Sequence, residues 1–329
     1  MNTMYDVVII GSGCAGLSAG IYAARGDNNP LIIKGDEPGG QLTLTTDVAN
    51  FPGFPDGITG SELINNMEEQ AVQFGAETTN GIVRDVDESE RPFVITLQDD
   101  TQYEADAIIV ASGASARTLG IPGEDELMGY GVSTCATCDG AFFRGEDMVV
   151  VGGGDAACEE ASFLTKFADT VHLIHRRDEL RAEAHWQSKL TEHVENGEVE
   201  IHWNSEVTEV TGSQSDGVNS VRVISHTDGH PTEKPESEVS DKTLGVGAMF
   251  VAIGHTPNTE FLEDTRVELD ENGYITVAGG VGQNKTETTV DGIFAAGDVF
   301  DFHYQQAVTA AGTGVQAALD VDAFISESD

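Results

Sequence analysis

The sequence predicts an α/β protein, because one pattern of strand, glycine turn and helix occurs twice along the chain. The first copy is the apolar run Tyr5–Ile10, followed by a glycine-rich turn and a helical stretch from Cys14 to Arg25. The second is Met148–Val151, again followed by glycines and a helical stretch from Ala156 to Phe167. A strand that enters a helix through such a turn is typical of dinucleotide-binding units, so we expect two Rossmann-like dinucleotide-binding domains.

The other predicted elements are strands, one long polar region and a last helix. Phe93–Leu97 and Ala107–Val110 have the composition of strands, with a polar turn between them. Residues 213–242 are polar and turn-rich, which is typical of a surface loop or hairpin tip. The final helix is predicted roughly from Tyr304 to Ser326.

Two late apolar strands, Ala248–Ile253 and Gly292–Ala296, decide the predicted domain organisation. No glycine phosphate loop follows either strand, so both should complete the first domain rather than build a third. The second domain is then an insertion into the first. We expect a discontinuous first domain of residues 1–116 and 247–329, and an inserted domain of residues 117–246.

The composition excludes several kinds of partner. The 329 residues include 57 Asp and Glu against 16 Lys and Arg, which gives a net charge of −41. Such a polyanion repels nucleic acids and anionic lipid surfaces. No apolar run approaches the ~18 residues of a membrane span, and the N-terminus lacks the basic start of a signal peptide, so we expect a soluble, cytoplasmic protein. The scattered acids also suggest a halophilic surface.

The first glycine loop, from Gly11 to Gly16, matches G-x-G-x-x-G directly after a strand and before a helix. Its glycines permit a tight turn and let a pyrophosphate approach the helix N–H groups. About 20 residues further on, Asp36 or Glu37 could bind the adenosine ribose, although a carboxylate occurs there as readily by chance in so acidic a chain. Cys14, within the loop, has no second cysteine close in sequence, and we expect a passive small side chain.

The second loop, from Gly152 to Ala157, matches G-x-G-x-x-A. After the next strand, Arg176, Arg177 and Arg181 fall within six residues of a chain that has only 16 basic residues. The alternative is a solvated run of charge. Arginines at this place in a Rossmann unit accommodate the 2′-phosphate that distinguishes NADP from NAD, so NADPH is favoured over NADH.

Cys135 and Cys138, followed by Asp139, form the only C-x-x-C motif of the chain. A zinc site would need two more ligands, but Cys158 falls inside the second nucleotide helix and the nine histidines show no ligand spacing, so we expect no metal. As a redox pair, the two thiols can close a small disulfide ring. A neighbouring carboxylic acid can move the proton that thiol–disulfide exchange requires, unless Asp139 is only a surface acid.

Taken together, the motifs resemble those of the low-molecular-weight thioredoxin reductases. Seven stretches carry this resemblance: residues 11–16, 39–42, 135–139, 152–157, 175–177, 254–258 and 292–298. The likeness covers nearly the whole chain, and a CATCD motif between two nucleotide loops is highly specific. Asp298 ends the last of these stretches, after an apolar strand.

The resemblance implies a homodimeric flavoprotein that passes electrons from NADPH to FAD, then to the disulfide and finally to thioredoxin. It implies that Cys138 lies nearer the flavin and that Asp139 is the proton donor, while the sulfur that attacks thioredoxin stays open. The implied FAD contacts are Gly11, Ser12, Gly13, Gly16, Gly40, Gln41, Asn50, Asp298, Gln306 and Ala307. The expected NADPH contacts are Gly152, Gly154, Ala157, Arg176, Arg177 and Arg181.

Two residues depart from the family pattern, which usually has Pro in place of Cys14 and often Arg in place of Gln305. The second departure concerns one cofactor contact. The family's domain rotation implies hinges near Arg117 and Gly245. Two other functions stay open: a flavoprotein disulfide reductase that serves another redox protein, and a flavin-binding redox sensor without turnover. The complete second loop and its arginines argue against the sensor, which would not need an NADPH site.

Overall fold

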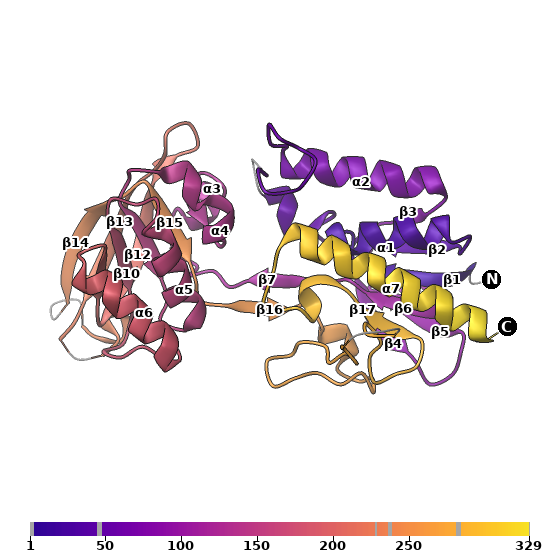
Figure 1. Ribbon diagram of the computed structural model, residues 1–329. Helices are drawn as coiled ribbons and strands as arrows, with labels where there is room; N and C mark the ends of the chain where they lie inside the picture. The colour runs from indigo at the N-terminus through magenta and orange to yellow at the C-terminus, as the bar shows by residue number, and fades with distance from the viewer. Residues whose placement is uncertain (1–2, 45–47, 228, 236–238, 281–283, 329) are drawn as a thin grey trace. The chain divides into compact units, whose positions relative to one another are not determined.

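The protein is described here by a computed structural model (Figure 1). It describes residues 3–44, 48–227, 229–235, 239–280 and 284–328. The chain divides into two compact units: the first unit comprises Met1–Ser115 and Thr256–Asp329, and the second unit comprises Ala116–His255. The second unit is therefore one continuous stretch of chain inserted into the first.

The first unit is built on a seven-stranded sheet of order β3-β2-β1-β6-β5-β4, with β17 paired to β6. Its strands are β1 (Thr3–Ile10), β2 (Pro30–Ile33), β3 (Glu77–Thr79), β4 (Val83–Asp87), β5 (Phe93–Leu97), β6 (Gln102–Val110) and β17 (Ile293–Ala295). The pairings among β3, β2, β1, β6 and β17 are parallel, whereas β4 and β5 add an antiparallel edge. The central strand β1 is covered on both faces, which explains its unbroken apolar run.

Three α-helices cover one face of this sheet: α1 (Cys14–Arg25), α2 (Gly60–Phe74) and α7 (Ala307–Ser328). Helices α1 and α7 pack side by side (Figure 1). A Cβ on Gly314 of α7 would lie 2.1 Å from the Ala15 carbonyl oxygen of α1, so only glycine lets these helices approach so closely. The short 3₁₀ helices of this unit are η1 (Gly40–Leu44), η5 (Glu260–Leu262) and η6 (Gly297–Val299).

The second unit is built on a five-stranded parallel sheet of order β11-β10-β9-β15-β8. Its strands are β8 (Val132–Ser133), β9 (Met148–Val151), β10 (Val171–Ile174), β11 (Val199–His202) and β15 (Ala248–Val251). Helices α5 (Asp155–Leu164) and α6 (Ala184–Glu195) cover one face. The other face packs against an antiparallel sheet of β12 (Ser205–Ser213), β13 (Gly217–Ser225) and β14 (Ser240–Gly245). Shorter helices are α3 (Glu124–Leu127), α4 (Ala136–Asp139), η2 (Gly140–Phe143) and η3 (Pro231–Glu233).

The polar region 213–242 is more regular than a surface loop, because it contains β13 and the start of β14. Three valines of β13, Val218, Val221 and Val223, are buried in the core beneath the antiparallel sheet. Residues 228 and 236–238 of this region lie outside the described residues.

The predicted second domain boundary, between residues 246 and 247, is wrong. Strand β15 pairs in parallel with β9, and Phe250 is fully buried in the core of the second unit. The chain crosses back between His255 and Thr256 instead. The absence of a glycine loop after β15 did not indicate which domain the strand belongs to, because a strand can extend the sheet of the inserted unit without binding a phosphate.

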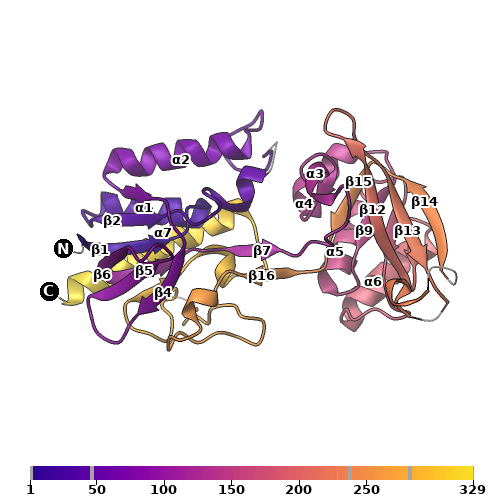
Figure 2. The same ribbon diagram turned by 180° about the vertical axis from the view of Figure 1, so that it is seen from behind.

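The two crossings of the chain lie in short strands, β7 (Ala114–Ala116) and β16 (His255–Pro257), which pair with one another (Figure 2). Beside them, Asn258 donates a hydrogen bond from Nδ2 to the Ser112 carbonyl at 2.9 Å, and its own carbonyl accepts one from Ser112 Oγ at 2.7 Å. The crossing predicted near Gly245 is therefore displaced to the β16 strand. Every helix within the described residues is too short or too polar to cross a membrane.

Candidate functional site

The glycine loop of the first unit joins β1 to α1 at the point where the strand order reverses. Gly11 has φ of +114°, and a Cβ there would lie 2.1 Å from the carbonyl oxygen of Ala111, the residue after β6. A Cβ on Gly16 would lie 1.9 Å from the Gly11 carbonyl oxygen. Gly13 precedes α1, and no side chain caps the first turn of that helix. The loop therefore leaves helix N–H groups available to a phosphate.

A second segment is tied to this loop by Ser12. Its Oγ accepts a hydrogen bond from the Gly39 N–H at 2.9 Å and donates one to the Lys34 carbonyl at 3.3 Å. Gly40 follows with φ of +67° and begins η1, where the Gln41 side-chain amide donates to the carbonyl of Ala114. Ser12, Gly40 and Gln41, all predicted from sequence, thus lie at one end of the sheet.

Asp298 lies at the start of α1, although it is distant in sequence. Burial, and then repulsion by Asp301, raises the pKa of the Asp298 carboxyl to about 7. Burial and the nearby Asp298 raise the pKa of the Cys14 thiol to about 12. Cys14 is therefore a protonated, buried thiol, as expected of a passive side chain.

Asn50 and Gln306, two more of the predicted residues, contact one another although they are 256 positions apart in the sequence. The Asn50 side-chain amide donates a hydrogen bond to Gln306 Oε1 at 3.3 Å, and the Gln306 N–H donates to Thr309 Oγ1 at 3.3 Å. Ala307 then begins α7. Gln305, which departs from the family pattern, holds a left-handed backbone with φ of +46°.

The residues of the first unit fit an adenine dinucleotide such as FAD. Gly11 and Gly16 have no room for a Cβ, α1 is uncapped, and a buried carboxyl lies beside its first turn. Asp36 and Glu37, the two candidates for the ribose, are both exposed, and the Glu37 N–H donates a hydrogen bond to the Asp36 carboxylate at 3.1 Å.

The second unit repeats this construction. Gly152 has φ of +157°, and a Cβ there would lie 2.4 Å from the carbonyl oxygen of Ala252, the residue after β15, and 2.6 Å from Ala157 Cβ. Ala157 is fully buried. Gly154 precedes α5, whose first turn has no side-chain cap. In both units, therefore, the first glycine of the loop packs against the backbone of the residue that follows the neighbouring strand.

Of the three arginines predicted to bind phosphate, Arg181 contacts this second loop directly. The Arg181 N–H donates a hydrogen bond to the Gly153 carbonyl at 2.7 Å. Burial lowers the pKa of the His175 imidazole beside the loop, and the charges of Arg177 and Arg181 lower it further. Hydrogen bonds with the backbone of Glu179 and Gly152 act in the opposite direction.

Within the described residues, none of Arg176, Arg177 and Arg181 pairs with a carboxylate, whereas three other arginines of the chain do. In so acidic a chain, three neighbouring arginines that pair with no described carboxylate favour an anionic ligand.

The dithiol forms a disulfide at the start of α4, with the Cα atoms of Cys135 and Cys138 5.3 Å apart. Ser133 Oγ accepts a hydrogen bond from the Cys135 N–H at 3.0 Å, and the N–H groups of Cys138 and Asp139 donate to the Cys135 carbonyl at 3.2 Å. Asp139 is half-buried. The other two cysteines are free and buried, so this pair is the one disulfide of the chain.

Sequence reasoning missed Glu160. This residue lies on α5, which packs against α4, and its carboxylate accepts a hydrogen bond from the Ala136 N–H between the two cysteines. Burial, with repulsion by Glu159, raises the pKa of Glu160 to about 8, although the hydrogen bond from Ala136 by itself lowers it. Its Oε2 atom is buried and has no hydrogen-bond partner among the described residues. Nothing in the sequence distinguishes it from the chain's other acids, because only the packing of α4 on α5 places it there.

Known proteins resemble this chain over almost its full length. The family model "Pyridine nucleotide-disulphide oxidoreductase" matches residues 5–314. A thioredoxin reductase of Escherichia coli O157:H7 is 47% identical over 97% of this chain and 95% of its own. A glucosaminate ammonia-lyase of Pseudomonas fluorescens is 46% identical over 97% of this chain and 95% of its own. The solved structure of a thioredoxin reductase from Giardia duodenalis has a TM-score of 0.88 and 40% identity, covering 99% of this chain and 100% of that one.

Proposed function

Because the chain belongs to the pyridine nucleotide-disulphide oxidoreductases, among the thioredoxin reductases, we propose that it reduces thioredoxin with electrons from NADPH. The observation that carries this proposal is the Cys135–Cys138 disulfide, which is the one redox group made by the chain itself. A free, buried thiol such as Cys158, whose pKa burial raises to about 11, offers no comparable chemistry.

The first unit holds FAD and the second unit holds NADPH. In the first unit, Gly11, Gly13 and Gly16 leave room for the pyrophosphate, and the other predicted contacts are Ser12, Gly40, Gln41, Asn50, Asp298, Gln306 and Ala307. In the second, Gly152, Gly154 and Ala157 form the loop, and Arg176, Arg177 and Arg181 bind the 2′-phosphate. When bound, NADPH supplies a hydride and the flavin relays its two electrons. Two copies of the chain form a homodimer, which sedimentation would test.

The chain's own residues carry out the later steps. Two electrons and two protons convert the Cys135–Cys138 disulfide into two thiols, with Asp139 moving a proton. One of the two sulfurs, as thiolate, attacks the thioredoxin disulfide and forms a mixed disulfide. The other sulfur then attacks the first, which restores the Cys135–Cys138 bond and releases thioredoxin with two thiols.

Steady consumption of NADPH by the purified holoprotein with oxidised thioredoxin tests the proposal. We expect many turnovers per chain, each yielding one reduced thioredoxin. A single turnover would indicate a redox sensor, and turnover with another disulfide protein alone would indicate another acceptor. Ammonia release from glucosaminate, assayed in parallel, tests the activity named for the Pseudomonas relative. Elimination of ammonia moves no electrons to a disulfide, so we expect none.

A further inference from the structure

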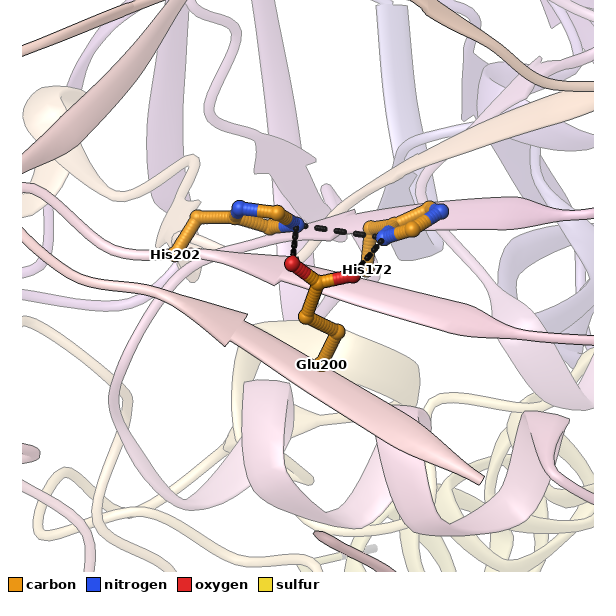
Figure 3. Close-up of side chains that lie close together, drawn as sticks. All are labelled: His172, Glu200 and His202. Atoms are coloured by element: carbon orange, nitrogen blue, oxygen red, sulfur yellow. Dashed lines mark hydrogen bonds and ion pairs between the residues drawn. The ribbon is translucent and has the colours of Figure 1, made fainter. Parts of the chain in front are cut away.

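Three side chains with metal-binding atoms lie together on the parallel sheet of the second unit, and the redox reaction uses none of them (Figure 3). The register of β10 and β11 pairs His172 with Glu200, and Ile174 with His202. Because side chains alternate along a strand, His172, Glu200 and His202 project from the same face of the sheet. Strand β11 is the edge of that sheet, so the Glu200 side chain is 61% exposed while both imidazoles are buried.

The ligand atoms of these three side chains point toward one another (Figure 3). His172 Nδ1 lies 3.1 Å from His202 Nε2. The carboxylate faces both nitrogens, with Oε2 3.6 Å from His172 Nδ1 and Oε1 3.7 Å from His202 Nε2. Two ligand atoms of one zinc ion are at most about 4.4 Å apart, because each bond is about 2.0–2.2 Å long. All three separations therefore allow one shared cation.

The geometry points to a metal site, and we propose that His172, Glu200 and His202 bind one divalent transition-metal cation of the zinc class. Two bonds of about 2.0–2.1 Å span nitrogens 3.1 Å apart at an angle of roughly 100°, close to tetrahedral. Two imidazoles and one carboxylate favour zinc, cobalt, nickel or copper over calcium and magnesium, which prefer oxygen ligands. The exposed side of Glu200 leaves a coordination position for water.

Lys242 competes with the cation. Its ammonium lies 2.9 Å from His202 Nδ1 and donates a hydrogen bond there, which leaves the ring proton on Nε2, facing His172. Metal binding at Nε2 requires that proton to move to Nδ1 and the ammonium to withdraw. Lys242 is exposed and can turn into solvent.

Calorimetric titration of the metal-stripped, oxidised holoprotein with zinc chloride tests the proposal. The disulfide keeps the dithiol from binding zinc. A parallel titration with calcium measures the weak binding expected from 57 acidic residues. We expect one zinc ion per chain to bind well above that background and to raise the thermal midpoint.

Two variants address the site directly. Glu200→Gln should weaken zinc binding by at least the roughly 10- to 100-fold that is typical when a hydrogen-bond partner of a ligand is lost. Because Glu200 is exposed, the metal-free thermal midpoint should stay unchanged. Lys242→Gln should tighten zinc binding about 10-fold, because its amide oxygen can accept the Nδ1 proton. A merely structural role for these residues would give no such opposite effects.

A matched control is His193→Gln, in the same unit. His193 Nδ1 lies 2.7 Å from Glu198 Oε2, but this pair has no second imidazole and should not affect zinc binding. Zinc binding no stronger than calcium binding would overturn the proposal. Equal zinc affinity in the wild type and Glu200→Gln, or a loss in His193→Gln equal to that in Glu200→Gln, would place the metal elsewhere and overturn it as well.

Discussion

Cys135 and Cys138 act after the flavin, so single sulfur changes should separate two steps of the reaction. Cys135→Ser and Cys138→Ser should keep reduction of the flavin by NADPH, since that step uses neither sulfur, and lose reduction of thioredoxin. The variant that retains the attacking sulfur should trap thioredoxin as a mixed disulfide. Stopped-flow flavin spectra and thioredoxin turnover measure the two steps.

The free, buried Cys158 provides the control, because Cys158→Ser changes a sulfur outside the disulfide. Its thioredoxin turnover should match that of the wild type. Substantial turnover in either of the other two variants would contradict the electron path.

Asp139→Asn should slow the dithiol steps by about 10²- to 10⁴-fold if this residue moves the proton, with flavin reduction unaffected. Glu90→Gln, at an exposed acid of the first unit, provides a control for the loss of one negative charge. Equal turnover in Asp139→Asn and the control would assign the proton transfer to another group.

Glu160 should make the stability of the protein depend on pH. Its pKa is about 8 in the folded chain and 4.5 in the reference state. Between these values the unfolded chain ionises while the folded chain keeps the proton, so the free energy of unfolding falls as pH rises through this range. Glu160→Gln removes this contribution, and its stability relative to the wild type should rise from pH 5 to pH 9. Urea titrations at both pH values test this, and a constant difference would contradict it.

Single residues also show how far sequence predicts a site. The glycines were predictable, because a motif fixes their spacing and backbone geometry excludes a Cβ at Gly11 and Gly16. Glu160 and the pair His172 and His202 were not, because each meets its neighbours only through packing between elements. The expectation of no metal rested on local histidine spacing, which cannot detect imidazoles that meet across neighbouring strands.

The segment after β10 should determine the choice of nucleotide. Each charge-assisted contact to a phosphate contributes on the order of 1.5–3 kcal/mol, so Arg176→Ala combined with Arg177→Ala should weaken NADPH binding by about 10²-fold or more and leave NADH nearly unchanged. Arg222→Ala, which breaks a surface ion pair with Asp241 in the same unit, is the control. Flavin bleaching by each nucleotide gives the measurement. An undiminished NADPH preference would refute the assignment.

Elements were predicted best where a motif and an apolar strand coincide, as at β1 with α1 and β9 with α5. Strand β15 was assigned to the wrong domain, because an apolar run shows that a strand is buried but not which sheet it joins. The polar region before it concealed β13, because its three buried valines are separated by polar residues and do not form an apolar run.

The net charge of −41 should make the thermal stability of the whole protein depend on salt concentration. Among the described residues, Lys or Arg forms an ion pair with a carboxylate in four places, so most acids lack a close cation. Repulsion between them weakens when the Debye length falls from ~10 Å at 0.1 M to ~3 Å at 1 M salt. The thermal midpoint should rise between 0.1 M and 1 M KCl. A midpoint that stays constant or falls would contradict this.

The insertion of the second unit determines the order in which the two units can fold during translation. Ala116–His255 is continuous and can fold as soon as it has emerged. The first unit cannot, because β17 and α7 are translated after the whole inserted unit. The strands around β1 therefore keep an exposed apolar face until β17 and α7 have been translated. Exposed apolar surface of this kind is what chaperones bind, so we expect them to bind the N-terminal third of the chain during synthesis.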